Sequence, residues 1–460
     1  MPDIPCPLRE AARHNPSLTA LDAGGHRFTY LELDEWVQGT ANRLAAEGLR
    51  PGDRLALWME NDWRMVVLLL ASLRAGVVVC PLSTRLPAIE ANLDMLSAAV
   101  LISDRLGRAP EDYVERAVAQ GDTAHPHARP ATIIFTTGSS GRPKAVLHSY
   151  ANHYYSAIGS NRNISVKPHD RWLVSIPMYH VGGIAIIFRC LIGRGTITLR
   201  PKIPLKEAIL QVTHASLVST QLLRLMQSDV SVEGLKAVLL GGSGIPAQLI
   251  NSALERRLPI HTSYGLTEMA SQVATTRPSP TRKELRTSGR VLPHRELKIA
   301  SDGMILVRGK TRFLGYVDGR DLIEPFRPDG WYATGDIGRW TENDHLEVLG
   351  RIDNMFVSGG ENVMPEEIED ALTAIEGVER AVVVGIDHEE FGRRPVAFLD
   401  AGDLTLDPAG LRAVLALSLP GFKVPVRFFP WPYRDAPSGM KVDRAFFERE
   451  ASALMRRASS

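Results

Sequence analysis

Residues 132–146 read TIIFTTGSSGRPKAV, an apolar strand that runs directly into a loop of small, hydroxylated and basic residues. Small residues let the backbone approach a polyanion, and successive backbone N–H groups then form a nest for its oxygens. The hydroxyls add donors and Lys144 adds a positive charge, although the spacing is not that of the Walker pattern. A glycine–serine loop alone is often a plain surface turn. The hydroxyls, two glycines and the lysine directly after a buried strand favour a phosphate-binding loop.

Strands and helices alternate around this loop. Residues 54–59 and 77–82 have the apolar character of short strands, and residues 62–75 between them form a predicted helix capped by Asn61 or Asp62. Further short strands are predicted at three apolar runs, residues 99–103, 215–219 and 237–242. Because strands that alternate with helices form parallel sheets covered by those helices, we predict an α/β fold.

The pattern changes near residue 351. Two predicted helices and two predicted strands follow one another there, at residues 364–378, 379–387, 394–400 and 411–419. Together they make a compact α+β module of about 100 residues, which is a usual domain size. We therefore predict a large N-terminal domain of helix-covered sheets, residues 1–350, and a small, mobile α+β C-terminal domain, residues 351–460.

Composition argues against several other classes of protein. The net charge is only +1, which argues against a nucleic-acid-binding protein that depends on bulk charge. Cys6, Cys80 and Cys190 lack CxxC spacing, so neither a disulfide framework nor a cysteine metal site is expected, and a reducing cytoplasm fits. The N-terminus lacks a signal-peptide pattern, and the most apolar stretch, residues 65–73, is too short to span a bilayer. The sequence leaves open whether the chain forms a homo-oligomer.

Two further segments carry residue types that suit a nucleotide. Residues 263–270 read SYGLTEMA, in which Tyr264 could stack on a purine while Thr267 and Glu268 offer hard oxygen ligands for Mg²⁺. Alone, such a string is more often an ordinary junction between a strand and a helix. The string WYATGDIG places Asp336 in a glycine-flanked turn, where it could accept both ribose hydroxyls or merely close an Asx-turn.

The last two segments lie in the C-terminal part of the chain. Residues 350–369 read GRIDNMFVSGGENVMPEEIE, and residues 436–447 read APSGMKVDRAFF. The second of these places Lys441 in a glycine-containing loop, where a lone lysine is normally just solvated.

All five segments, in this order and at these intervals, resemble the superfamily of adenylate-forming enzymes, which comprises acyl- and aryl-CoA synthetases, peptide-synthetase adenylation domains and luciferases. The resemblance covers nearly the whole chain, and five ordered motifs together outweigh the simpler explanation of each one. It implies an enzyme that uses ATP and Mg²⁺ to activate a carboxylic acid as an acyl-AMP. The acyl group would then pass to a thiol, that of coenzyme A.

The resemblance also implies which residues bind the nucleotide. The β- and γ-phosphates would be held by Thr136, Thr137, Gly138, Ser139, Ser140, Gly141 and Lys144. The adenine site would be lined by Gly242, Ser243, Gly244, Tyr264 and Gly265. Asp336 and Arg351 would bind the ribose, and Asp353 would be the hinge between the two domains.

Catalytic roles follow from the same resemblance. Thr267 would contact the α-phosphate, Glu268 would hold Mg²⁺, and His180 would belong to the catalytic set. Lys441 would bridge the substrate carboxylate and the α-phosphate. The physics agrees, because two anions must meet as charge develops on phosphorus, and a lysine and a metal ion stabilise that transition state.

Less specific stretches resemble the 2-succinylbenzoate–CoA ligases of menaquinone synthesis. They are residues 176–195, 215–226, 238–246 and 263–276. The loop around Lys441 also has the G-x-K-x-x-R arrangement that some of those ligases show. The implied substrate carries two carboxylates, of which only one is activated, so the other needs a cation in a largely apolar pocket.

Arg189 is the candidate for that cation, because it lies in an otherwise apolar run, AIIFRCLI, at residues 185–192. The alternative is an arginine that snorkels to the surface or pairs with an acid. Buried arginines usually have a dedicated anion, which favours the substrate role. Thr220 is the second residue assigned to the substrate site.

Other functions stay open at this point. The chain could be a CoA ligase for another aryl or medium-chain acid, or an adenylation enzyme that loads a separate carrier protein. It could also be a nucleotide-binding protein that has lost catalysis. The intact set Lys144, Glu268, Asp336, Arg351 and Lys441 argues against that last alternative.

Overall fold

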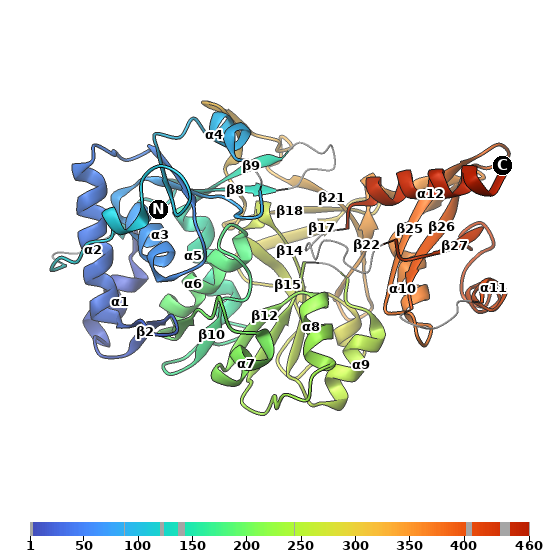
Figure 1. Ribbon diagram of the computed structural model, residues 1–460, viewed down its shortest axis with the longest axis horizontal. Coiled ribbons are helices and arrows are strands. Elements are labelled where there is room, and N and C mark those ends of the chain that lie inside the picture. The colour runs from blue at the N-terminus through green and yellow to red at the C-terminus, as the bar shows by residue number, and fades with distance from the viewer. Residues whose placement is uncertain are drawn as a thin grey trace.

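A computed structural model describes residues 3–86, 88–119, 124–136, 143–242, 244–401, 407–432 and 442–459 (Figure 1). The largest sheet has nine strands, and its centre is parallel from β14 through β2. The spatial order is β16 (Arg290–Val291), β15 (Ser271–Thr275), β14 (Ile260–Leu266), β13 (Ala237–Leu240), β12 (His214–Leu217), β10 (Arg171–Leu173), β11 (Thr196–Thr198), β2 (Thr19–Asp22) and β3 (Arg27–Thr29). The predicted α/β class with parallel sheets is confirmed.

A second sheet of seven strands carries the predicted phosphate loop. Its order is β20 (Asp321–Ile323), β19 (Gly315–Asp318), β9 (Lys144–Ser149), β8 (Pro130–Thr136), β5 (Val78–Pro81), β4 (Arg54–Trp58) and β6 (Val100–Ser103). Strands β8 and β9 form an antiparallel hairpin in which Thr136 pairs with Lys144. Thr136 and Lys144, the described residues on either side of the predicted phosphate loop, therefore lie opposite each other.

Helices pack between these two sheets. They are α1 (Pro7–His14), α2 (Tyr30–Ala46), α3 (Trp63–Ala75), α5 (Tyr150–Asn161) and α6 (Val181–Gly193). One apolar core contains side chains of α2, α3 and α6 together with strand residues of both sheets, which explains why α3 is apolar nearly all round. Of the two predicted caps, Asp62 caps α3 by accepting from the backbone N–H groups of Arg64 and Met65, and Gly76, whose φ is +81°, is the C-cap.

Shorter helices cover the outer surfaces. They are α4 (Glu90–Leu96), α7 (Leu205–Ala208), α8 (Ser219–Met226) and α9 (Ala247–Glu255). A third, antiparallel sheet has the order β17 (Arg295–Ile299), β18 (Met304–Gly309), β21 (Tyr332–Trp340) and β22 (Leu346–Arg351). In this sheet Asp336 lies directly opposite Arg351.

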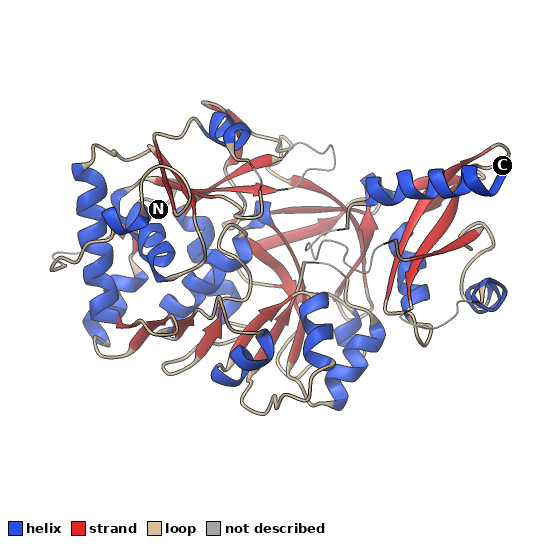
Figure 2. Cartoon of the chain, in the orientation of Figure 1, coloured by secondary structure: helices blue, strands red, loops and turns tan. Residues whose placement is uncertain are grey.

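The last hundred residues form a separate sheet with its own helices, at one end of the molecule (Figure 2). The strands are β23 (Phe356–Ser358), β24 (Glu361–Val363), β25 (Arg380–His388), β26 (Gly392–Asp400) and β27 (Arg427–Pro430). The helices are α10 (Pro365–Thr373), α11 (Pro408–Ala416) and α12 (Arg444–Ser459). Two apolar clusters made only of residues from this region lie on the two faces of the sheet. The exact domain boundary and the mobility of this part stay predictions.

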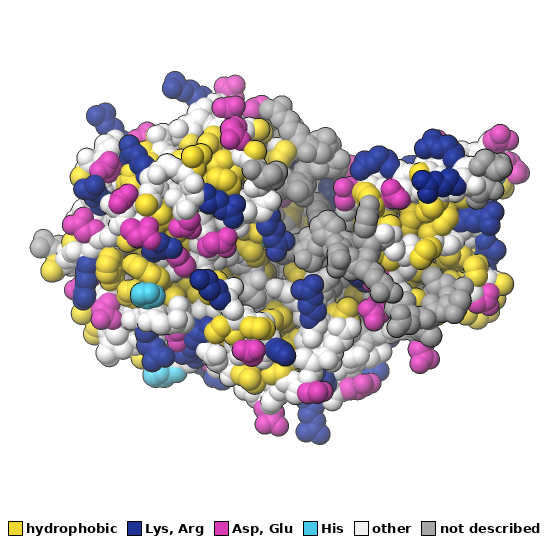
Figure 3. All heavy atoms as spheres, in the orientation of Figure 1, with side chains coloured by type: hydrophobic (Ala, Val, Ile, Leu, Met, Phe, Trp, Pro, Cys, Tyr) yellow, Lys and Arg dark blue, Asp and Glu magenta, His cyan; other side chains and the backbone are white. Residues whose placement is uncertain are grey.

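The surface agrees with the balanced composition. Basic and acidic side chains are interspersed over the face shown in Figure 3. Among the described helices, none combines the length and the hydrophobicity that crossing a bilayer requires.

Candidate active site

Asp336 lies at the centre of a chain of polar contacts that joins three strands. The Tyr264 hydroxyl, from β14, donates a hydrogen bond to Asp336 Oδ2 at 2.6 Å. Arg351, from β22, donates to Asp336 Oδ1 at 3.1 Å and to Asp353 Oδ2 at 3.2 Å. Burial, together with the neighbouring Asp336, raises the pKa of Tyr264, so its phenol remains a donor. The carboxylate, the arginine and the tyrosine expected at one nucleoside site thus meet in the folded chain.

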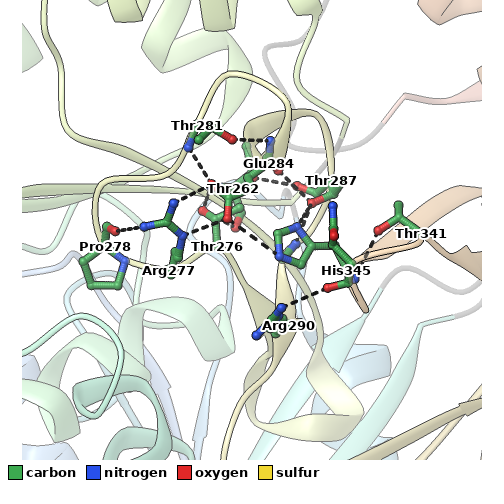
Figure 4. A network of polar contacts seen from close by, with 12 residues as sticks. Thr262, Thr276, Arg277, Pro278, Thr281, Glu284, Thr287, Arg290, Thr341 and His345 are labelled. Atoms are coloured by element: carbon green, nitrogen blue, oxygen red, sulfur yellow. Dashed lines mark hydrogen bonds and ion pairs between the residues drawn. The ribbon is translucent and has the colours of Figure 1, made fainter.

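A second set of contacts braces the far end of the same strands (Figure 4). Thr262, two residues before Tyr264 on β14, donates its hydroxyl to the Thr287 carbonyl at 2.6 Å. The Thr287 hydroxyl in turn lies 3.3 Å from Nδ1 of His345, in the turn between β21 and β22. This network connects the strand that carries Tyr264 to the hairpin that carries Asp336 and Arg351.

Glu268 lies among two tyrosines and close to the phosphate-loop hairpin. Its Oε1 accepts hydrogen bonds from the hydroxyls of Tyr316 at 2.8 Å and Tyr332 at 3.4 Å. The Nζ of Lys144 lies 5.2 Å from the centre of the Tyr316 ring, within the range of a cation–π contact. The metal-binding candidate and the lysine of the phosphate loop therefore share one neighbour, Tyr316.

The turn that carries Glu268 has an unusual backbone. A short 3-10 helix, η3 (Thr267–Met269), is followed by Ala270 with φ +52° and Ser271 with φ +108°, and both values are uncommon for residues other than glycine. Gly265, just before the turn, has no room for a side chain, because a Cβ there would lie 2.3 Å from the Ser271 carbonyl oxygen. Such strain costs on the order of 1–3 kcal/mol per residue and clusters at functional sites.

The glycine segment after β13 lies against the first turn of α8. Gly242 has φ +92°, and the Gly244 carbonyl accepts a hydrogen bond from the Ser219 hydroxyl at 2.9 Å. Thr220 follows Ser219 and is half-buried. The adenine and substrate candidates of this region are therefore neighbours.

His180 immediately precedes α6 and is neutral at pH 7. Burial, with a contribution from nearby Arg85, lowers the pKa of His180 to about 4. A cavity of about 340 Å³ is lined by Tyr179 and Gln221, the sequence neighbours of His180 and Thr220.

Arg189 is fully buried, with only 1% of its surface exposed. Its guanidinium lies 5.2 Å from the centre of the Trp172 ring, and Nη2 donates to the Ser271 hydroxyl at 3.3 Å. Burial lowers the pKa of Arg189 to about 10, so the group is still charged at pH 7. Within the described part of the chain, no carboxylate pairs with this guanidinium and its Nε has no hydrogen-bond partner. Arg189 therefore neither extends to the surface nor pairs with an acid among the described residues, so both alternatives are wrong.

Several predicted site residues lie outside the described residues. They are Thr137, Gly138, Ser139, Ser140, Gly141, Ser243 and Lys441. Thr136 and Lys144 mark the two ends of the phosphate loop, and Asp353 lies in a short 3-10 turn, η5 (Ile352–Asn354), directly after β22.

Sequence reasoning missed the two tyrosines that contact Glu268. Tyr332 lies on the same face of β21 as Thr334 and Asp336, because all three alternate positions are buried. That two-residue period was a usable signal for Tyr332. Tyr316 carries no comparable signal, because the pairing of β19 with β9 brings it to the site from a distant part of the chain.

Comparison with known proteins gives consistent results over nearly the full length. The family model of the AMP-binding enzyme matches residues 8–102 and 89–317, and that of the AMP-binding enzyme C-terminal domain matches residues 367–431. The 2-succinylbenzoate–CoA ligase of Bacillus licheniformis is 33% identical over 93% of this chain and 95% of its own length. The Escherichia coli (strain K12) ligase of the same name is 35% identical over 92% of this chain and 93% of its own.

Solved structures agree. The o-succinylbenzoate CoA synthetase from Bacillus subtilis, in complex with the acyl-adenylate intermediate OSB-AMP, superposes with a TM-score of 0.87 at 27% identity, covering 97% of this chain and 99% of that one. An arginine-to-lysine variant of the Escherichia coli enzyme with bound OSB-AMS superposes with a TM-score of 0.84 at 32% identity, covering 98% of this chain and 99% of that one.

Proposed function

The chain belongs to the AMP-binding enzyme family, and we propose that within this family it is a 2-succinylbenzoate–CoA ligase of menaquinone biosynthesis. In the first half-reaction a substrate carboxylate oxygen attacks the α-phosphorus of ATP, which forms acyl-AMP and releases pyrophosphate. In the second, the thiolate of coenzyme A attacks the acyl carbon, which forms the thioester and releases AMP. The named relatives are 33% and 35% identical to this chain over more than nine-tenths of its length, which supports this proposal.

The geometry of the site supports a specific set of nucleotide contacts. Asp336, already an acceptor for Tyr264 and Arg351, offers a carboxylate to the ribose hydroxyls. Glu268 suits Mg²⁺, because this ion takes one or two protein carboxylates together with phosphate oxygens. When bound, the ion would offset the charge on the phosphates during transfer. Lys144 would hold the outer phosphates, and the half-buried Thr267 would contact the α-phosphate.

One observation carries the choice of a dicarboxylic acid, namely the buried and unpaired charge of Arg189 described above. A cation taken out of water is costly unless an anion meets it. Arg189 already reaches Ser271, at the strained turn that follows Thr267 and Glu268. A second carboxylate of the substrate would supply the missing anion while the first carboxylate is activated.

Arg189→Leu is expected to reduce kcat/KM for 2-succinylbenzoate by about tenfold to a hundredfold, because a charge-assisted hydrogen bond contributes about 1.5–3 kcal/mol. The KM for ATP should barely change. With a monocarboxylic analogue such as benzoate, the same substitution should be neutral or favourable, because no anion remains to pair. Steady-state kinetics with both acids measure the difference.

Arg295→Leu is the matched control. Arg295 is also buried, but its guanidinium donates to the backbone carbonyls of Gln272, Pro293 and Ser156. Its loss should lower stability without distinguishing the two acids. If Arg189→Leu loses activity equally on both acids, Arg189 is structural and the dicarboxylic substrate loses its support.

The decisive test of the function itself is carboxylate-dependent exchange of pyrophosphate into ATP across a panel of acids. Coenzyme A is then added to the acids that respond. Exchange with 2-succinylbenzoate and conversion to its CoA thioester support the proposal. Exchange only with other aryl or medium-chain acids would move the chain to the alternative ligase. Exchange without any CoA-dependent turnover would favour an enzyme that loads a carrier protein.

We further infer that residues 351–460 swing about Asp353 between the half-reactions, because this part carries both Lys441 and the loop around residues 358–361. Asp353→Pro fixes φ in the short turn between Ile352 and Asn354. We expect thioester formation to slow by at least about tenfold while adenylation changes little, since effects of hinge residues fall on conformational steps. Separate assays of the two half-reactions measure this.

Asp353→Ala is the control, because it removes the contact with Arg351 but leaves the backbone free. A hinge role requires the proline variant to be much slower than the alanine variant in the second step. Two unchanged half-reactions in the proline variant would place the hinge elsewhere.

Finally, all three cysteines are free and buried, which fits a reducing compartment, and we place the enzyme in the cytoplasm.

A further inference from the structure

Two buried histidines and a threonine form a polar relay beneath the phosphate-loop hairpin. The hydroxyl of Thr132, on β8, lies 2.8 Å from Nε2 of His153 on α5 and 3.3 Å from Nδ1 of His148 on β9. Nε2 of His148 lies 2.7 Å from the carbonyl oxygen of Thr267. None of the three side chains is more than 1% exposed. The relay therefore links both strands of the hairpin to the turn that carries Thr267 and Glu268.

The direction of every hydrogen bond in the relay follows from its end point. The Thr267 carbonyl can only accept, so His148 carries its proton on Nε2. Burial lowers the pKa of His148 to about 4, so the ring is neutral and its Nδ1 accepts from the Thr132 hydroxyl. The Thr132 oxygen then accepts from the Nε2–H of His153. This leaves Nδ1 of His153 as an acceptor with no partner among the described residues.

The relay is not needed to satisfy the turn. The Thr267 carbonyl already accepts the N–H of Ala270 at 2.9 Å, which closes the 3-10 helix. The hydrogen bond from His148 is a second one to the same oxygen. Three apolar side chains could fill the same volume without burying two imidazoles and an unpartnered nitrogen, whose desolvation is unfavourable. The relay thus adds a second, directional hydrogen bond to the turn, and its burial lowers the stability of the fold.

Adenylation requires that the turn of Thr267 and Glu268 has a fixed position relative to the phosphate loop. The Glu268 carbonyl accepts the N–H of Phe313 at 2.8 Å, so the backbone on both sides of the Thr267–Glu268 peptide is held by a group from elsewhere in the chain. One of these two hydrogen bonds comes from His148 on β9, the strand whose first residue is Lys144. A shift of the turn relative to β9 would change the distance between the Glu268 carboxylate and the phosphate loop.

We propose that His148, held by Thr132 and His153, is a positioning residue that fixes the turn of Thr267 and Glu268 against the phosphate-loop hairpin during adenylation. This role rests on the nucleotide site proposed above and goes beyond it, because all three side chains are buried and none of them is assigned to the nucleotide. His148 sets where the metal ligand lies relative to the outer phosphates.

Three variants test the relay. His148→Leu removes both ring nitrogens, and Thr132→Val removes one hydroxyl with almost no change of shape. His148→Gln keeps an N–H donor that can reach the Thr267 carbonyl. A displacement of about 1 Å at a reacting site can cost on the order of a hundredfold in rate. We therefore expect His148→Leu and Thr132→Val to lower kcat of acid-dependent pyrophosphate release by about tenfold to a hundredfold, and His148→Gln to stay close to wild type.

Two readouts separate positioning from a general loss of structure. The conversion of supplied acyl-AMP and CoA to thioester needs no pyrophosphate geometry and should stay unchanged in folded variants. The Mg²⁺ concentration for half-maximal adenylation should rise, because Glu268 no longer lies where the phosphates require it. Matched controls are His125→Leu, which removes a buried histidine that stacks on Tyr150, and Thr40→Val, which removes a buried hydroxyl in α2.

Calorimetric titration of the variants with MgATP, without any acid, tests the relay independently of the substrate. Weaker binding of MgATP by His148→Leu and Thr132→Val but not by His148→Gln supports the relay even if wild type rejects 2-succinylbenzoate, in which case only the substrate proposal fails. Unchanged MgATP affinity in folded Thr132→Val and His148→Leu overturns the relay. Equal losses in His148→Gln and His148→Leu, or equal losses in both half-reactions, also overturn it. If His148→Leu does not fold, Thr132→Val decides.

Discussion

Lys441→Ala should slow adenylate formation by about a thousandfold while leaving the conversion of acyl-AMP to the CoA thioester nearly intact. The substrate carboxylate and the α-phosphate repel each other as charge builds on phosphorus, and a lysine between them offsets that repulsion only in this step. Lys441 lies outside the described residues, but the chain just beyond it is held. Arg444 donates to Glu366 at 3.1 Å and to Glu369 at 2.9 Å, both on α10.

The two half-reactions must be measured separately, adenylation as pyrophosphate release and thioester formation from supplied acyl-AMP. Lys423→Ala is the control, because Lys423 is another lysine of the C-terminal region, and its partner is Glu367. It should leave both steps unchanged. Equal loss of both steps in Lys441→Ala would show that the lysine supports the structure or both reactions, and the assignment to adenylation would be wrong.

Asp336→Ala should weaken the binding of ATP by about a hundredfold to ten-thousandfold, because two charge-assisted hydrogen bonds to the ribose each contribute about 1.5–3 kcal/mol. The substitution also leaves the Tyr264 hydroxyl without its acceptor and Arg351 without one of its two carboxylates. Titration calorimetry with ATP measures the affinity, and the KM for ATP should rise in parallel. The KM for the acid should change much less.

A comparison with two other variants separates binding from stability. Asp22 is likewise buried and accepts from Arg171 and Arg200. It lies on β2, near the edge of the nine-stranded sheet that is opposite to β14 and Tyr264. Asp22→Ala should lower the unfolding temperature without changing ATP affinity. Tyr264→Phe removes one hydroxyl and should weaken ATP binding less than Asp336→Ala does. An ATP affinity that is unchanged in folded Asp336→Ala would remove Asp336 from the nucleotide site.

Much of the fold could be predicted because its signals are local. The helix at α3 was predicted with Asn61 or Asp62 as its cap, and the cap is Asp62, since capping depends on residues two and three positions along the chain. The alternation of short apolar runs with helices predicted the α/β class, because it reflects how each segment buries one face. The phosphate loop, the turn with Glu268 and the strand with Asp336 were predicted for the same reason. Each is a contiguous string whose residue types suit one chemical task.

Which of these strings meet depends on pairing between distant segments. The register of β21 against β22 places Arg351 opposite Asp336, and the crossover to β14 brings the Tyr264 hydroxyl to the same carboxylate. The alternation of buried residues indicates which face of the sheet a side chain points to, but it does not say which residue of which strand lies opposite. Tyr316 reaches Glu268 in the same way, through the pairing of β19 with β9.

Burial was likewise visible only in the folded chain. The apolar run around Arg189 suggested a buried cation, but a helix of that composition could equally have left the guanidinium at the surface. The packing of α6 against Trp172 and Ser271 removes it from water. The relay of His148, Thr132 and His153 has no sequence signature, because its three members lie on two strands and a helix and are ordinary residues there. The types of residue along the chain determined which chemical groups are available. Only the packing of distant segments determined which of these groups face one another, because hydrogen bonds and desolvation depend on distances between atoms that the order of residues does not give.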